Sequence, residues 1–232
     1  MPYSSKTFQS NLEALKARIQ RSCEASGRSM DQVKLMAVTK RFSLEVAASA
    51  VENGLAVLGE NRVQEGVEKI RQADFKARWE LIGHLQSNKA QLAAQYFDCI
   101  QSVDSVKLAK RLDRFAGEAG KQLPVLLQVN TGKDPGKFGF SVDETEAAVN
   151  VILGLPSLLI EGLMTIAPLP PTVESATTAF NDLRTLRDHL VDKTGHPLPE
   201  LSMGMSFDLE SAIQAGSTCI RVGSALFGER PV

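Results

Sequence analysis

A lysine that could perform carbonyl chemistry closes one of the apolar runs of the sequence. Lys40 follows the run 33–39, and a polar turn comes directly after it. Burial at a strand end would disfavour the ammonium form, which in water has a pKa of about 10.4. Such an amine is able to attack an aldehyde near neutral pH and form a Schiff base. Position alone equally allows a strand-end lysine that simply reaches solvent.

An arginine near the end of the chain has the pattern of an inward-facing strand residue. Arg221 lies in the run 219–223, where strand alternation puts it on the same face as Gly223. A buried guanidinium needs a partner, because taking its charge out of water is costly. That partner is either a core carboxylate or the ring nitrogen of a ligand. An arginine would keep a pyridine nitrogen neutral, since the guanidinium retains its own proton.

Two loops have the features of a phosphate site. Ser206 precedes a helical pattern that starts at Phe207, so we predict it as the helix N-cap, either as an ordinary cap or with its hydroxyl offered to an anion. Gly223 and Ser224 open the last turn, where a residue without a Cβ lets backbone N–H groups approach a phosphate. An amine for an aldehyde, an arginine for a pyridine nitrogen and a phosphate site describe pyridoxal 5'-phosphate (PLP).

The acidic residues of the first of these loops complicate the phosphate prediction. Asp208 and Glu210 suit the start of a helix, but they would repel a phosphate if they faced it. We therefore expect both carboxylates to point away from the site.

These residues can meet only in a fold that brings strand ends together. Apolar runs with strand character alternate with amphipathic helical segments; they cover 33–39, 57–60, 80–84, 99–103, 125–130, 159–166, 200–205 and 219–223. Eight strand–helix units predict an α/β fold, a single (β/α)8 TIM barrel over residues 1–232. Phe8, Leu12, Leu15 and Ile19 predict an extra N-terminal helix. The alternative is a doubly wound open sheet, which predicts a GxGxxG turn that the sequence lacks.

Composition argues against several classes of partner. The chain has 232 residues with 27 acidic and 26 basic ones, which favours neither nucleic acid nor a membrane surface. Its three cysteines form no CxxC pair, which predicts reduced thiols and no metal site; we expect Cys99 and Cys219 in the core. No run approaches the ~20 apolar residues of a membrane span, and the N-terminus lacks the apolar region of a signal peptide. We expect a cytoplasmic protein.

Several motifs in order resemble the YggS-type pyridoxal phosphate homeostasis family, whose fold is similar to the N-terminal barrel domain of alanine racemase. The resemblance covers nearly the whole chain through Leu35-Met-Ala-Val-Thr-Lys40, Gly59-Glu-Asn61, Gly83-His-Leu-Gln-Ser-Asn-Lys89, Gly162-Leu-Met164, Leu201-Ser-Met-Gly-Met-Ser206 and Ile220-Arg-Val-Gly-Ser-Ala-Leu-Phe-Gly228. It implies that Lys40 carries PLP as a Schiff base and that Arg221 faces the ring nitrogen. It also implies that Ser206, Gly223 and Ser224 hold the phosphate.

The sequence leaves the roles of four further residues, in these and nearby motifs, undecided between alternatives. Asn61 either flanks the ring or caps the next helix. His84 contacts the cofactor edge or a loop; we do not expect a general base, because no orienting carboxylate stands beside it in the sequence. Met164 either packs against the ring or fills the mouth of the barrel. Lys137 is either a solvated loop lysine or a second amine that receives the aldehyde.

The residues favour a carrier over an enzyme. Racemisation needs a base on each face of the substrate, and the resemblance implies that racemases take the second one, a tyrosine, from another domain and subunit. Tyr3 and Tyr96 lie in the leading segment and at a helix end, so neither is a clear candidate. We predict a monomer without catalytic residues that buffers or delivers PLP to apo-PLP enzymes and affects amino-acid and keto-acid metabolism indirectly. A PLP-dependent amino-acid racemase and a Schiff-base aldolase are the alternatives.

Overall fold

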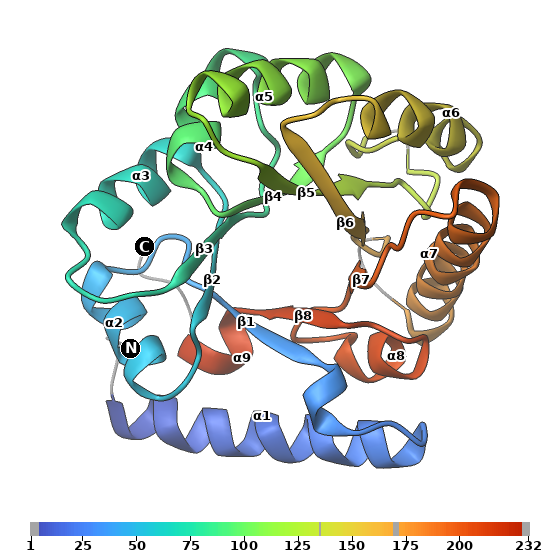
Figure 1. Cartoon of the computed structure of the whole chain (residues 1–232). Helices are drawn as coiled ribbons and strands as arrows, with labels where there is room; N and C mark the ends of the chain where they lie inside the picture. Colours follow the sequence, from blue (N-terminus) through green and yellow to red (C-terminus); the bar gives the residue numbers. More distant parts are fainter. Residues whose placement is uncertain (1–4, 135, 169–171, 229–232) are drawn as a thin grey trace.

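Eight parallel strands close into a barrel that is surrounded by helices (Figure 1). The computed structural model describes residues 5–134, 136–168 and 172–228. The strands are β1 (Lys34–Val38), β2 (Val57–Glu60), β3 (Arg78–Leu81), β4 (Cys99–Val103), β5 (Leu123–Gln128), β6 (Leu158–Met164), β7 (Glu200–Ser202) and β8 (Cys219–Val222). Each strand pairs with its neighbour in sequence, and β1 pairs with β8, so the predicted barrel is confirmed.

The helices follow the strands in the order that the hydrophobic pattern predicts. They are α1 (Ser5–Ala25), α2 (Leu44–Glu52), α3 (Val63–Gln72), α4 (Ala90–Tyr96), α5 (Val106–Glu118), α6 (Val142–Leu153), α7 (Val173–Thr194), α8 (Leu209–Gln214) and α9 (Ser224–Phe227), with short 3-10 turns η1 (Met30–Gln32) and η2 (Ser87–Lys89). Local chemistry sets several ends. Ser141 and Glu144 form a capping box at the start of α6, and Gly195 ends α7 with a φ of 68°.

Six strands end one to three residues earlier than the sequence predicts, and the difference is largest for β3 and β7. β7 ends at Ser202 instead of residue 205, and β3 ends at Leu81 instead of residue 84. After β7, Gly204 has a φ of 96°, and a Cβ there would lie 2.4 Å from the Cβ of Ala212. The chain therefore turns towards α8 at a position that only glycine fits, while hydrogen bonds from Met203 to Cys219 and from Arg221 to Gly204 continue the backbone contact with β8.

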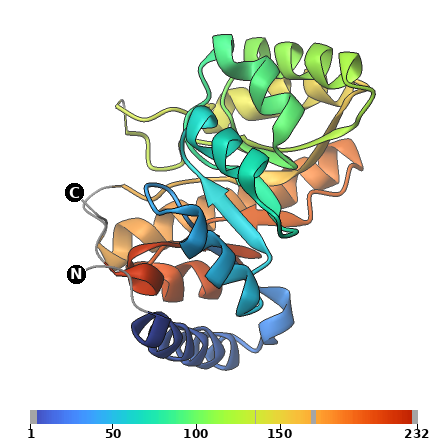
Figure 2. The same ribbon diagram turned by 90° about the vertical axis from the view of Figure 1, so that its left-hand side faces the viewer.

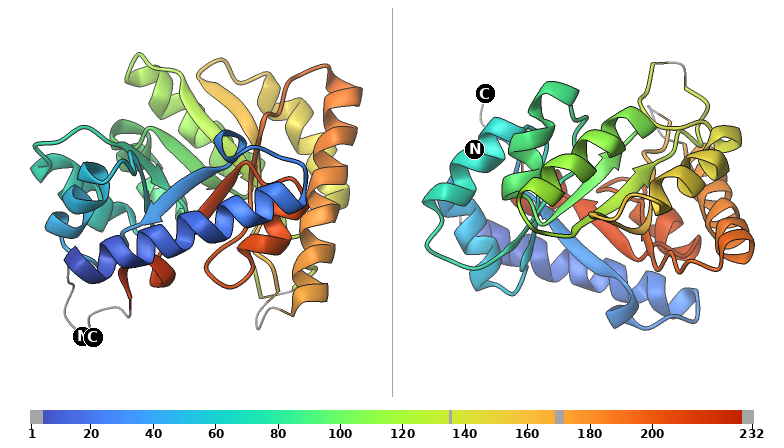
Figure 3. Two further views of the ribbon diagram at one scale, coloured as in Figure 1. Left: turned by 90° about the horizontal axis from the view of Figure 1, so that it is seen from below. Right: turned by 45° about the horizontal axis from the view of Figure 1, so that its top comes forward.

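The extra N-terminal helix lies along the outside of the barrel beside α8 and α9 (Figure 3). Its predicted apolar face, Phe8, Leu12, Leu15 and Ile19, is buried. The ring of Phe8 stacks on that of Phe227 in α9 with centroids 5.5 Å apart. α1 thus covers the part of the barrel next to the loops after β7 and β8.

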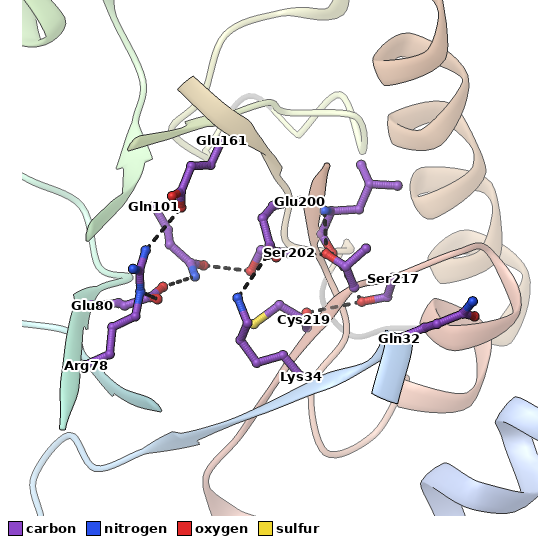
Figure 4. Close-up of polar contacts among 12 residues, drawn as sticks. Gln32, Lys34, Arg78, Glu80, Gln101, Glu161, Glu200, Ser202, Ser217 and Cys219 are labelled. Atoms are coloured by element: carbon purple, nitrogen blue, oxygen red, sulfur yellow. Dashed lines mark hydrogen bonds and ion pairs between the residues drawn. The ribbon is translucent and has the colours of Figure 1, made fainter. Parts of the chain in front are cut away.

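Polar and charged side chains from several strands contact one another in the barrel interior (Figure 4). Cys99 and Cys219 are buried, as predicted, and burial raises the pKa of the Cys219 thiol to about 12. Cys23 is buried as well and, like the other two, forms no disulfide. In the described residues, no helix combines the length and apolar character that crossing a membrane requires.

Candidate cofactor site

The carboxyl ends of the strands surround a cavity of about 240 Å³. This is the end from which the loop after β5 projects (Figure 2). The cavity is lined by Val38, Lys40, Asn61, Ile82, Ile166, Met205, Ser206, Phe207, Arg221, Gly223 and Ser224. The structure therefore brings together six of the eight residues that the sequence indicated. His84 and Met164 do not line the cavity.

The backbone on both sides of Lys40 is anchored to neighbouring side chains. The Thr39 hydroxyl donates to Glu60 at 2.7 Å, and Lys69 donates to the Thr39 carbonyl at 2.8 Å. On the other side, the Arg41 N–H donates to Glu65, and Arg41 has a φ of 65°, which is unusual for a residue with a side chain. Lys40 itself is half-buried and lines the cavity, so it does not simply extend into solvent.

A buried ion cluster beneath this turn was not found by sequence reasoning. Lys69 contacts Glu60 at 2.8 Å and Glu65 at 3.0 Å, and Glu60 is fully buried. Burial raises the pKa of Glu60, and its contact with Lys69 only partly offsets this effect. The spacing of Glu65 and Lys69, four residues apart on α3, was the available signal.

Arg221 lies almost fully buried between the cavity and the barrel interior. It is 4% exposed, and it donates to the Ser202 hydroxyl at 2.7 Å and to the Thr165 carbonyl at 2.8 Å. Among the described residues it forms no ion pair with a carboxylate, so the alternative of a buried salt bridge is not found there. Burial lowers the pKa of its guanidinium.

The loops after β7 and β8 meet through their serines. The hydroxyl of Ser206 accepts from the Ser224 hydroxyl at 3.2 Å and from the Ala225 N–H at 3.3 Å. Gly223 immediately precedes α9, and a Cβ there would lie 3.3 Å from the Val38 carbonyl. Ser206, Gly223 and Ser224 thus gather around the first turn of α9, at one wall of the cavity.

The predicted role of Ser206 as the N-cap of the following helix is wrong. α8 begins only at Leu209, and Asp208 occupies the N-cap position. The reason is that the Asp208 carboxylate accepts from the Met205 N–H at 2.5 Å, which folds residues 205–208 into a turn of their own. Ser206 is thereby directed to α9 on the neighbouring strand end instead.

Glu210 of this segment points away from the cavity, as expected, whereas Asp208 lies close enough to Arg221 to act on its charge. Glu210 pairs with Arg18 on α1 at 2.8 Å, and Asp208 is buried within its own turn. Neither residue lines the cavity. A phosphate in the cavity would therefore meet hydroxyl and N–H groups at this wall.

Asn61 enters the cavity because a glycine allows it to do so. α3 has Arg62 as its N-cap, without a capping side chain, so the alternative in which Asn61 caps that helix is wrong. A Cβ at Gly83 would lie 2.1 Å from the Asn61 carbonyl oxygen, a distance that no side chain could occupy. The loops after β2 and β3 can approach each other only because residue 83 is glycine.

His84 lies outside the cavity and has a partner that the sequence did not reveal. Its Nδ1 is 2.9 Å from the carboxylate of Asp104, and its ring stacks on Phe138 with centroids 3.5 Å apart. No carboxylate stands beside His84 in the sequence, but the fold supplies one, so its absence is no longer an argument against a general base. Asp104 is 20 residues away and reaches His84 because β3 and β4 end side by side.

The other two uncertain residues are also placed by the structure. Met164 is fully buried and packs with Cys99 and Leu126, so it fills the barrel interior and does not line the cavity. Lys137 donates to the Ala167 carbonyl at 2.7 Å and lies 3.6 Å from Asp134. Its side chain is 20% exposed, so it is not a solvated loop lysine.

A larger cavity of about 910 Å³ lies elsewhere, between α6, α7 and the loop after β5. It holds none of the predicted site residues. Acidic side chains from Asp134, Asp143, Glu144 and Asp182 are part of its lining. We assign the site to the smaller cavity on chemical grounds, because only that one combines an amine, a buried arginine and two hydroxyls.

Fold and site together define a barrel of the alanine racemase N-terminal type. A family model described as "Alanine racemase, N-terminal domain" matches residues 10–231. An alanine racemase from Clostridium difficile has a similar fold, with a TM-score of 0.78, 18% identity, and coverage of 98% of this chain and 58% of that one.

Relatives with higher sequence identity show which family of this class the chain belongs to. The pyridoxal phosphate homeostasis protein of Vibrio cholerae is 38% identical over 97% of both chains. The solved structure of PipY from Synechococcus elongatus PCC7942, with PLP bound, has a TM-score of 0.81 and 38% identity, and the match covers 91% of this chain and all of that one. The chain belongs to the family of pyridoxal phosphate homeostasis proteins.

Proposed function

We propose that this protein binds PLP as a Schiff base on Lys40 and acts as a carrier that buffers or delivers the cofactor. The observation that supports this most is the meeting of Lys40, Arg221 and the first turn of α9 in one cavity. The names of the relatives and the PLP in the PipY structure agree with it. PLP, when bound, supplies an aldehyde that reacts with amines and a ring that accepts electrons.

The residues of the cavity fit the parts of this cofactor. Lys40 provides the amine for the aldehyde, held in place by the anchored turn from Thr39 to Arg41. Arg221 provides a donor for the ring nitrogen, and Asn61 provides an amide at the edge of the same cavity. Because these groups add positive charge and none of the described carboxylates lines the cavity, the site favours a ligand with negative charge.

Phosphate recognition would come from the loops after β7 and β8. Ser206 and Ser224 offer hydroxyls, and Gly223 allows close approach of the backbone at the start of α9. Val38, Ile82 and Ile166 line the same cavity and supply apolar surface for a ring. This set of groups is the one that PLP needs.

The position of Tyr96 favours a carrier over a racemase. The Tyr96 hydroxyl accepts from Arg71 at 2.9 Å on the outer helices α3 and α4, so it is not positioned as a second base. Tyr3 lies outside the described residues. His84 is oriented by Asp104, but it stacks on Phe138 and does not line the cavity.

Absorption and trapping experiments test the binding site. The protein purified with PLP should absorb visible light, and borohydride reduction should fix the cofactor on Lys40 alone. Lys89→Ala and Lys137→Ala serve as matched controls and should retain the label. Lys40→Ala should lose the fixed label but keep weaker PLP binding through Ser206, Gly223 and Ser224. A label found only on Lys89 or Lys137 would overturn the assignment.

A second experiment distinguishes the carrier from an enzyme. The PLP-loaded protein should restore activity to an apo-PLP enzyme, and PLP free in solution at the same concentration is the control. Incubation with an L-amino acid should leave its optical rotation unchanged. Racemisation at an ordinary turnover of about 1–10³ per second would refute the carrier proposal.

A further inference from the structure

A continuous chain of hydrogen bonds crosses the barrel interior and ends on Arg221. Arg221 donates to the Ser202 hydroxyl at 2.7 Å, and this hydroxyl donates to the Gln101 side-chain oxygen at 2.6 Å. The Gln101 amide then donates to Glu80 at 2.6 Å, and Arg78 pairs with the other oxygen of that carboxylate at 2.6 Å. Figure 4 shows the part from Arg78 to Ser202.

The members come from opposite sides of the barrel. Glu80 and Arg78 are on β3 and Gln101 is on β4, whereas Ser202 is on β7 and Arg221 on β8. Arg221, Ser202, Gln101 and Glu80 are each at most 4% exposed. The chain therefore connects the wall of the cavity with the amino end of the barrel through a region without exposed polar groups.

The three hydrogen bonds from Arg221 to Glu80 all donate in the same direction. A carboxylate only accepts, so Glu80 requires the amide nitrogen of Gln101, which turns the amide oxygen towards Ser202. The Ser202 hydroxyl then donates its proton to the Gln101 oxygen, and the Ser202 oxygen accepts from the guanidinium of Arg221. Each bond polarises the next, so the carboxylate of Glu80 fixes the order of donors and acceptors as far as Arg221.

We propose that Gln101 and Glu80 are positioning residues for Arg221, which hold its guanidinium in the orientation that faces a PLP ring nitrogen. This inference rests on the proposed function, and it assigns a role to residues that lie outside the cavity. Among the described residues Arg221 forms no ion pair; the carboxylate of Asp208 favours its positive charge through space, whereas the hydrogen-bond chain fixes the direction of its Nη1 donor.

The same interior contains a matched control. Lys34 pairs with Glu200 at 2.9 Å, and Glu200 accepts from Thr218, but no hydrogen bond of the described residues joins this group to Arg221. Lys34→Met therefore removes a partly exposed ion pair, together with a positive charge near Glu80, and leaves every hydrogen bond of the chain in place. Gln101→Met is the corresponding test variant, since it keeps the side-chain length and removes both amide contacts.

The test combines PLP binding with a measurement that needs no cofactor. We expect the PLP dissociation constant of Gln101→Met to rise about tenfold, the scale of one hydrogen bond to a charged group, and its visible absorption maximum to shift. Without PLP, the NMR signal of the Arg221 side chain should move or broaden. Lys34→Met should retain the wild-type affinity, spectrum and Arg221 signal.

The outcomes separate this inference from the proposed function. If Gln101→Met folds and keeps the wild-type spectrum, PLP affinity and Arg221 signal, the positioning role is wrong. Absence of PLP binding by the wild-type protein would instead overturn the proposed function, while the Arg221 signal still reports on positioning. If Gln101→Met does not fold, Ser202→Ala interrupts the chain one bond closer to Arg221, and the same readouts decide.

Discussion

The amino end of the barrel and the wall of the cavity at its carboxyl end surround their cations differently. At the amino end, Lys34 contacts Glu200 at 2.9 Å, and Arg78 contacts Glu80 at 2.6 Å and Glu161 at 3.1 Å. Each of these cations lies directly against a carboxylate. At the carboxyl end, the buried Arg221 contacts a hydroxyl and a carbonyl, and its nearest carboxylate connection runs through two intervening side chains.

This difference agrees with the separate roles of the two ends in barrels of this kind. The amino end is paired and closed, which contributes stability, whereas the carboxyl end is where loops build binding sites. A buried cation without an adjacent carboxylate is costly in the free protein. It is useful in a site for an anionic ligand, because the ligand supplies the missing charge. The comparison predicts opposite outcomes for the same type of substitution at the two ends.

The largest effect on stability is expected at the amino end. Arg78→Met should lower the free energy of unfolding by about 3 kcal/mol, because Glu80 and Glu161 then remain without their counter-ion. Urea denaturation of the ligand-free protein measures it. A loss well under about 1 kcal/mol would mean that this network contributes no more than a surface pair and that the two ends do not differ.

At the carboxyl end, Arg221→Met should affect binding more than folding. Removing a buried cation that has no adjacent carboxylate should change the free energy of unfolding by less than about 1 kcal/mol. PLP affinity should fall about a hundredfold, since a charged donor to the ligand is lost. Titration followed by visible absorption measures the affinity. An unchanged affinity and spectrum would mean that Arg221 has only a structural role.

Structural features that are determined within a single strand were predictable from the sequence. The bounds of β2 and β4 agree with the apolar runs, and the position of Lys40 and Arg221 at strand ends placed both residues in one cavity. Once the barrel is assumed, the meeting of strand ends follows from topology without knowledge of any side-chain contact.

Contacts that depend on packing between elements were not predictable. Asp104 reaches His84 across a loop, and Ser202 meets Gln101 from 101 residues away on the far side of the barrel. The N-cap of α8 was placed wrongly because Ser206 and Asp208 are both good capping residues, and only the local turn selects Asp208. Sequence spacing carries no information about which of these alternatives packs better.

An effect of intermediate size is expected where two loops of the carboxyl end touch. In Gly83→Ala the new Cβ would lie 2.1 Å from the Asn61 carbonyl oxygen, so the loops after β2 and β3 must separate. We expect a loss of about 2 kcal/mol of stability, together with weaker PLP binding. Gly154→Ala is the control, because its nearest contact is at 3.4 Å. Equal behaviour of both variants would show that Asn61 is not held by this contact.

The smallest effect is expected where Arg18 on α1 contacts the loop after β7. Arg18 pairs with Glu210 at 2.8 Å and also donates to the Ser206 carbonyl at 3.2 Å. Both members of the pair are partly exposed, so Arg18→Gln should cost less than about 1 kcal/mol near pH 7. PLP affinity should fall by about twofold, because only the backbone of Ser206 is loosened.

The pH dependence of stability shows whether this small effect comes from the Arg18–Glu210 ion pair. Burial alone would raise the pKa of Glu210, but the hydrogen bond from Arg18, a backbone hydrogen bond and the positive charges of Arg18 and Arg21 together outweigh it and hold this pKa below its ordinary value of 4.5. A carboxyl with a lowered pKa contributes stability above its unfolded pKa and loses it as the pH falls through the folded one. The stability difference between wild type and Arg18→Gln should therefore shrink as the pH falls from about 5 to about 3. Denaturation curves at each pH measure it, and Lys34→Met, at the other end of the barrel, is the reference. A difference that stays constant over this range would mean that Arg18 acts through packing and through the Ser206 carbonyl, without a contribution from the charge of Glu210.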